Sequence, residues 1–111
     1  MIAKPSPNVS SFTLKVHALE AQIRLIARDS EKVFFGKHAR ERLALRELSD
    51  RDALMILRIG NIKGDVEAGD EPGEWKCKVV GKQKGTQEIG VITIVQSSGR
   101  LFIKTVEWET K

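Results

Sequence analysis

The chain has 111 residues, 41% of them hydrophobic and 31% charged, with a formal net charge of +4. This length supports a single hydrophobic core, and we expect one domain over residues 10–111 after a flexible lead-in at residues 1–9. The lone cysteine, Cys77, excludes an internal disulfide and a multi-cysteine metal site. No run approaches the roughly 20 apolar residues of a membrane span, so we expect a cytoplasmic protein.

A first helix is predicted from a cap at Ser10 or Ser11 to about Arg28. One apolar stripe has helical spacing and should be buried; it comprises Phe12, Val16, Leu19, Ile23, Ile26 and Ala27. A second, weaker stripe lies on the opposite side and comprises Leu14, Ala18, Ala21 and Leu25. The second stripe is either ordinary exposed helix surface or a contact for a partner.

The segment Lys37 to Ser49, KHARERLALRELS, predicts a short helix with an unusual face. At about 100° per residue, His38, Arg42 and Arg46 project in one row with apolar residues on both flanks. Such a row should face a cleft or an ion-pair network. The preceding residues 32–35 form either a brief strand or an extended lead-in.

A third helix is predicted from Asp50 to Ile59. Ser49 should be its N-cap with Asp52 as an approximate capping-box partner, and Gly60 should end it. The segment 61–74 is rich in glycine and acidic residues and indicates a loop around a weak strand at residues 62–66. Three further strands are expected at residues 75–80, 89–95 and 101–108, with a hairpin loop at 82–86. Helices followed by strands indicate an α+β fold, with the helices on one face of an antiparallel sheet.

The candidate chemistry is that of a cationic site. Neither metal-ligand spacing nor a nucleophile elbow occurs, and no cofactor is expected. RNA cleavage without a metal needs a base, an acid and positive charge beside the phosphate. His38 can act as base or acid, since an unperturbed imidazole has a pKa of about 6.5. The candidate catalytic residues are His38, Arg42 and Lys104, and the candidate RNA-binding residues are Arg46, Lys76 and Lys78.

A family resemblance extends over about residues 30–108. The segments KHARERLALRELSDRDALMILRIGNI, WKCKV, GVITIV and LFIKTVEW resemble a family of small prokaryotic domains of unknown function. Its members have an H-A-x-x-R-(x)3-R-x-(I/L)-(S/T) helix motif, followed by a helix that ends at a glycine and by a β-sheet. The motif covers His38, Arg42, Arg46 and Gly60, with Thr93 and Thr105 on strands. That family is similar to the RelE-like and MqsR-like toxins. The similarity implies a metal-independent ribonuclease fold, with helices packed on a curved antiparallel sheet.

Toxins of this wider group cut mRNA, some of them on the ribosome, and an antitoxin protein holds them inactive. The resemblance implies the same activity and the same control for this chain. The better-studied toxins often use a sheet tyrosine, which this chain lacks. The alternative hypothesis is a non-catalytic domain that binds RNA or an acidic protein with the same basic surface. A third hypothesis is a structural domain in which the His38, Arg42 and Arg46 row forms an internal salt-bridge network.

Overall fold

The computed structural model describes residues 7–85 and 87–109 and has an α+β fold in which the helices come before most of the sheet. The helical elements are α1 (Pro7–Ala27), the short 3-10 helix η1 (Ser30–Lys32), α2 (Lys37–Leu45) and α3 (Asp50–Ile59). The strands are β1 (Val33–Phe35), β2 (Asn61–Ala68), β3 (Trp75–Lys84), β4 (Gln87–Val95) and β5 (Leu101–Trp108). The predicted fold class is therefore confirmed.

The five strands form one open sheet in the order β1-β5-β4-β3-β2. Neighbouring strands are antiparallel except for β1, which pairs in parallel with β5. The sheet is thus mixed, and the prediction of a wholly antiparallel sheet was wrong at this edge. The cause is the connection: the chain runs through two helices and three strands between β1 and β5, and so can return in the same direction.

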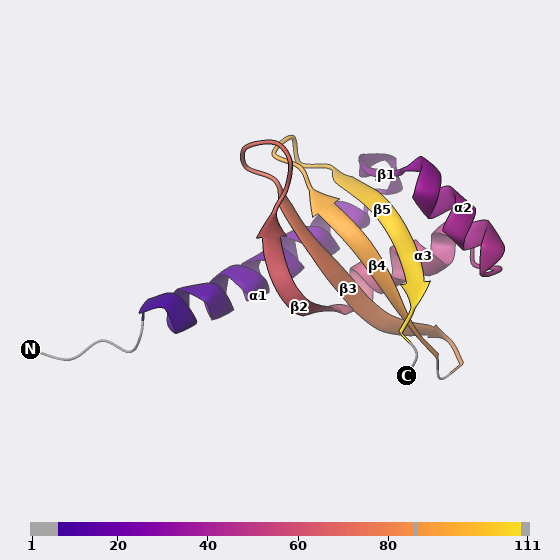
Figure 1. The fold of residues 1–111 in the computed structure, drawn as a ribbon, viewed down its shortest axis with the longest axis horizontal. Coiled ribbons are helices and arrows are strands. Elements are labelled where there is room, and N and C mark those ends of the chain that lie inside the picture. The colour runs from indigo at the N-terminus through magenta and orange to yellow at the C-terminus, as the bar shows by residue number, and fades with distance from the viewer. Residues whose placement is uncertain (1–6, 86, 110–111) are drawn as a thin grey trace, which may run out of the picture.

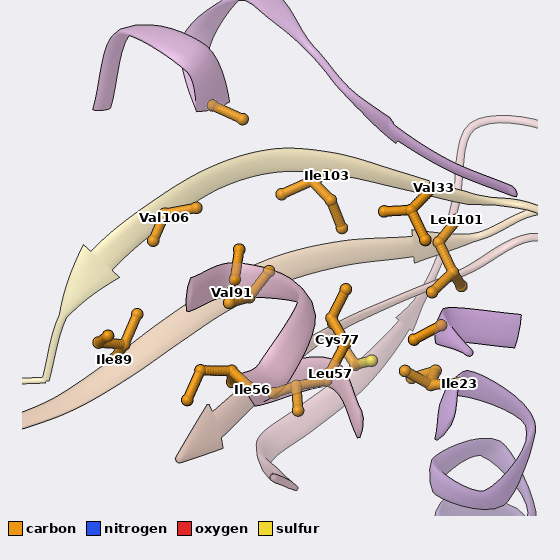
Figure 2. Close-up of a cluster of buried hydrophobic side chains, with 14 of the residues drawn as sticks. Ile23, Val33, Ile56, Leu57, Cys77, Ile89, Val91, Leu101, Ile103 and Val106 are labelled. Carbon is orange, nitrogen blue, oxygen red and sulfur yellow. The ribbon is translucent and has the colours of Figure 1, made fainter. Parts of the chain in front are cut away.

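The helices leave one face of the sheet open. Figure 1 shows α1 and α3 behind the strands, whereas α2 lies beside β5, on the side away from β4. The core fills the space between the sheet and the two covering helices, as Figure 2 shows for Ile23, Ile56, Leu57 and the strand residues above them. Only α1 and α3 therefore cover a face as predicted, and α2 is an edge element.

Helix α1 begins earlier than predicted. Its first residue is Pro7 rather than a residue after Ser10, because proline fits the first helical turn, where its missing N–H costs nothing. Residues 1–6 of the predicted lead-in lie outside the described residues. The predicted apolar stripe is buried from Leu19 to Ala27, and Ala18, Ala21 and Leu25 of the second stripe are exposed, Leu25 to 65%. Among the described residues, no helix has the length and apolarity that a membrane span requires.

Helix α2 ends sooner than predicted. It stops at Leu45, and Glu47 then adopts a left-handed conformation with φ of 56°. The N–H of Leu48 donates to the carbonyl of Leu43 at 2.8 Å, and that of Glu47 donates to Ala44 at 3.2 Å. These two bonds form a Schellman motif, in which a left-handed residue satisfies the last carbonyls of a helix. Arg46 is therefore the C-cap and does not continue the helical row.

Helix α3 matches the prediction closely. The Ser49 side chain accepts a hydrogen bond from the N–H of Asp52, whose carboxylate accepts one in return from the N–H of Ser49. Gly60 follows the helix, where a Cβ atom would lie 2.6 Å from the carbonyl oxygen of Val80. Gly60 also accepts a hydrogen bond from Arg24 at 2.9 Å. The glycine thus allows β2 to start in close contact with β3.

The strands are longer than predicted at two places. Strand β2 runs over the whole of Asn61–Ala68, and Gly64, with φ of 84°, lies at an irregularity in its pairing with β3. The hairpin between β3 and β4 also continues past Val80, with Gly81 opposite Ile89 and Lys82 opposite Glu88. Glycine and charged residues gave little strand signal here, but pairing across the hairpin extends the ladder.

Candidate functional site

A groove of about 520 Å³ lies on the open side of the sheet, between α2 and the strands. It is lined by His38, Arg42, Lys76, Ile92, Lys104 and Thr105, and we call it the cationic groove. These residues come from α2, β3, β4 and β5, so only folding brings them together. Four of the six predicted site residues meet here, including all three predicted catalytic residues.

A β-bulge in β5 forms one side of the cationic groove. Ile92 lies opposite Thr105 and Thr93 lies opposite Ile103, which leaves Lys104 as an extra residue without a cross-strand partner. As a result, Ile103 and Val106 are both fully buried although they are three positions apart. A regular strand would alternate faces, so the bulge turns both Lys104 and Thr105 toward the groove. The apolar and polar residues of β5 therefore do not follow a simple two-residue alternation.

Helix α2 forms the opposite side. Gly36 follows β1 and donates its N–H to the carbonyl of Ile103 at 3.0 Å, which attaches the start of α2 to β5. The helix buries Ala39 and Leu43 against the core. His38 and Arg42 are one turn apart on the groove side. The apolar flank of the helix thus holds its basic row beside the strand.

The charges of the cationic groove are mostly uncompensated. No hydrogen bond or ion pair among the described residues holds the side chain of Arg42 or Lys104. Nδ1 of His38 lies 3.6 Å from a carboxylate oxygen of Glu41 on the same helix. Nζ of Lys76 lies 3.9 Å from a carboxylate oxygen of Glu67, in an exposed pair of the kind that is worth little in water. An anion entering the groove would therefore meet free positive charge.

Arg46 lies outside the lining of the cationic groove. As the residue that caps α2, it is half-buried, and its Nε and Nη1 atoms are buried without a hydrogen-bond partner in the described structure. Arg46 lies away from the groove because α2 ends at Leu45, before the row of His38 and Arg42 can continue to it. The structure therefore separates Arg46 from His38 and Arg42, with which the sequence grouped it.

Lys78 belongs to a second depression of about 320 Å³. Its lining comprises Lys63, Gly64, Asp65, Glu67, Lys76, Cys77, Lys78, Ile92 and Glu107, and we call it the mixed-charge hollow. Nζ of Lys78 lies 2.8 Å from a carboxylate oxygen of Glu109 and 3.5 Å from one of Glu107. Lys63 approaches the other oxygen of Glu109 at 3.4 Å. The charge of Lys78 is thus already neutralised by ion pairs with carboxylates.

These contacts shift the titration of both partners. The hydrogen bond from Lys78 is the main cause that lowers the pKa of Glu109 below its ordinary value. The same hydrogen bond is the main cause that raises the pKa of Lys78, with the charges of Glu109 and Glu107 adding to it. Each group therefore stabilises the charged form of the other.

Some residues of the site were not predicted from the residue pattern. Ile92 lines both depressions, and an apolar residue within a strand gives no sign of a site. Glu109 neutralises Lys78 from 31 positions away, so no local pattern connects them. Among the motif residues, Thr105 lines the cationic groove, whereas Thr93 is fully buried and donates to the carbonyl of Val91. Among the described residues, no group of three or more His, Cys, Asp or Glu side chains is placed to hold a metal ion.

The sequence of residues 35–108 matches a family described as a domain of unknown function, DUF4258. The match spans the end of β1 through β5 and therefore every residue of the cationic groove. The chain belongs to this family, which confirms the resemblance to a domain of unknown function. Neither the curated proteins nor the solved structures gave a match.

Proposed function

We propose that the chain is a toxin-like, metal-independent RNA endonuclease that acts on mRNA and is controlled by an antitoxin protein. The observation that carries the proposal is the lining of the cationic groove, in which a histidine, an arginine and two lysines face one open space without a carboxylate. The proposal includes a relationship between this family and the RelE-like and MqsR-like toxins.

The proposed substrate follows from the charge of the groove. Phosphodiesters carry one negative charge each, and lysine and arginine bind them with release of counterions. Arg42 can contact two phosphate oxygens at once through its planar guanidinium, and Lys104 supplies a point charge from the other side. RNA is favoured over DNA because the chemistry needs a 2′-hydroxyl as the nucleophile.

The proposed reaction is a transesterification within the RNA. His38 accepts the proton of a 2′-hydroxyl through Nε2, since its Nδ1 faces Glu41, and the 2′-oxygen forms a bond to phosphorus. The bond from phosphorus to the 5′-oxygen breaks, and Lys104 donates a proton to that leaving oxygen. Arg42 stabilises the charge of the phosphorane-like transition state. The products are a 2′,3′-cyclic phosphate and a 5′-hydroxyl end.

A second candidate function is binding of RNA without cleavage. The exposure of His38 favours it, because its side chain is 81% exposed, whereas catalytic groups are strengthened by exclusion of water. The chain also lacks the tyrosine that the better-studied toxins often use. In this alternative, His38, Arg42, Lys76 and Lys104 bind phosphates and no bond is broken.

Induced expression with mapping of new 5′-hydroxyl RNA ends tests the proposal. We expect growth arrest and new ends with the wild-type chain, and loss of both with His38→Ala, since a general base contributes roughly 100- to 10,000-fold to rate. His17→Ala is the matched control, because His17 is exposed on α1 and lies outside the groove lining. If the wild-type chain cuts no RNA, either with or without ribosomes, the nuclease proposal is refuted and RNA binding without cleavage remains as the candidate function.

A further inference from the structure

A row of side chains leads from the cationic groove to an exposed aromatic residue. Lys76 lies opposite Ile94, Ile94 opposite Phe102, and Phe102 opposite Phe34. All four alternate with residues of the core face, so they project from the open face of the sheet. Ile94 is only 8% exposed although it does not belong to the core cluster. Its neighbours in the row, Lys76 and Phe102, are placed to cover it.

Phe34, at the end of this row, is 48% exposed. The guanidinium carbon of Arg100 lies 5.5 Å from the centre of its ring, within the range of a cation–π contact. Phe102 beside it is half-buried, and Gly36 gives its ring room, since a Cβ atom there would lie 2.6 Å from Cζ of Phe102. Two phenylalanines on adjacent strands and an arginine are thus grouped on the open face.

We propose that Phe34 and Phe102, with Arg100, form a base-binding subsite for single-stranded RNA whose phosphates lie in the cationic groove. This inference rests on the proposed function only in that the groove must bind RNA, and it holds whether or not RNA is cut. Phe102 is two residues from Lys104 along β5, a separation of about 7 Å in a strand. A neighbouring nucleotide of the bound strand can therefore reach the rings.

The chemistry of the row favours a single strand over a duplex. Unpaired bases can turn out and stack on phenylalanine or arginine planes, whereas the bases of an A-form duplex are already stacked on each other. Free cations beside exposed aromatic rings are the combination that binds single strands without strict sequence preference. A solitary exposed phenylalanine would need no explanation, but here a second ring and a cation accompany it.

Fluorescence anisotropy with a labelled 2′-O-methyl oligoribonucleotide tests the subsite, because this probe lacks the 2′-hydroxyl and cannot be cut. The same strand annealed to its complement is the duplex control. We expect Phe34→Leu to weaken binding of the single strand by about tenfold and leave duplex binding unchanged. Phe34→Trp should keep or raise the affinity, since it retains an aromatic face. Leu25→Ala, an exposed apolar change on α1, is the matched control and should have no effect.

The outcomes separate the two proposals. If Phe34→Leu binds the single strand as tightly as wild type while Lys104→Ala binds it more weakly, the subsite is refuted and the RNA-binding groove stands. An equal loss for single strand and duplex would also refute the subsite, because it indicates a structural role. If Phe34→Leu weakens binding selectively but natural RNA is never cut, the subsite stands and the nuclease fails. No binding of any probe would overturn both.

Discussion

The cationic groove and the mixed-charge hollow adjoin each other and share two residues, yet their charges differ. Three permanent cations and no carboxylate line the groove, whereas three lysines and three carboxylates line the hollow. Lys76 and Lys78 are two positions apart on one strand and indistinguishable in the sequence pattern. The partners of a lysine, rather than its strand face, therefore decide whether it is available to an anion.

Among the variants that test the difference between groove and hollow, the largest effect is expected at Arg42. Arg42→Ala should slow RNA cleavage by about 100- to 1,000-fold, the cost of removing one group that stabilises transition-state charge. Arg42→Lys should recover part of the rate, because it keeps the charge but loses two-point contact with the phosphate. Single-turnover rates on a labelled RNA measure both. Arg28→Ala, an exposed change in the turn after α1 and outside the groove lining, should leave the rate unaltered; an equal loss there would contradict the assignment.

The second prediction compares Lys104 with Lys78 in RNA binding. Lys104→Ala should reduce the steepness of the dependence of log affinity on log salt by about 0.7, the loss of one phosphate contact on a single strand. Lys78→Ala should leave this slope unchanged, because Glu107 and Glu109 already neutralise Lys78. Titrations at several salt concentrations measure the slopes. If the two variants lose the same slope, the distinction between groove and hollow fails.

The third prediction is a pH dependence of stability from the pair of Lys78 and Glu109. Because the folded pKa of Glu109 is lowered, its stabilisation is present above its ordinary pKa of 4.5 and is lost as the pH falls through the folded value. Because the folded pKa of Lys78 is raised, its stabilisation is present below 10.5 and is lost as the pH rises through the folded value. Glu109→Gln should therefore cost on the order of 1 kcal/mol near neutral pH.

Thermal unfolding of wild type and Glu109→Gln across pH measures this difference. The gap in melting temperature should be widest near neutrality and should narrow on acidification below 4.5. Glu31→Gln, an exposed change in η1, is the control. A gap that persisted at low pH would mean that packing supplies the stability instead, for example around Gly90, where an added Cβ atom would lie 2.8 Å from Oε2 of Glu109.

The smallest effect is expected at Glu67, which lies against Lys76 where the two depressions meet. Glu67→Gln removes the only carboxylate paired with Lys76 among the described ion pairs, so RNA affinity should rise by about twofold, as for the loss of one exposed ion pair. Asp70→Gln makes the same charge change in the loop after β2 and serves as the control for long-range charge. Equal gains in the two variants would show that only net charge matters.

Much of the fold could be predicted because its signals are local. The apolar stripe of α1, the capping box at Ser49 and the glycine after α3 depend on residues within a few positions of one another. The structure confirms the stripe from Leu19 to Ala27, the capping box and the glycine. Weak local signals do not predict the ends of elements, for a physical reason. Gly81 and Lys82 have low strand propensity, yet they pair because a partner strand is present. The left-handed Glu47 that ends α2 likewise lacks the glycine that normally marks such a site.

The sequence by itself determined the residue types of the candidate site, its α+β class and the basic face of α2. Only the tertiary structure decided which of those residues meet. The bulge at Lys104 turns two consecutive residues toward the groove, the end of α2 removes Arg46 from it, and Glu109 neutralises Lys78 across 31 positions. These outcomes depend on register and on charge pairing between distant segments, because helical and strand periodicity specify a face of an element but not the partner that it faces.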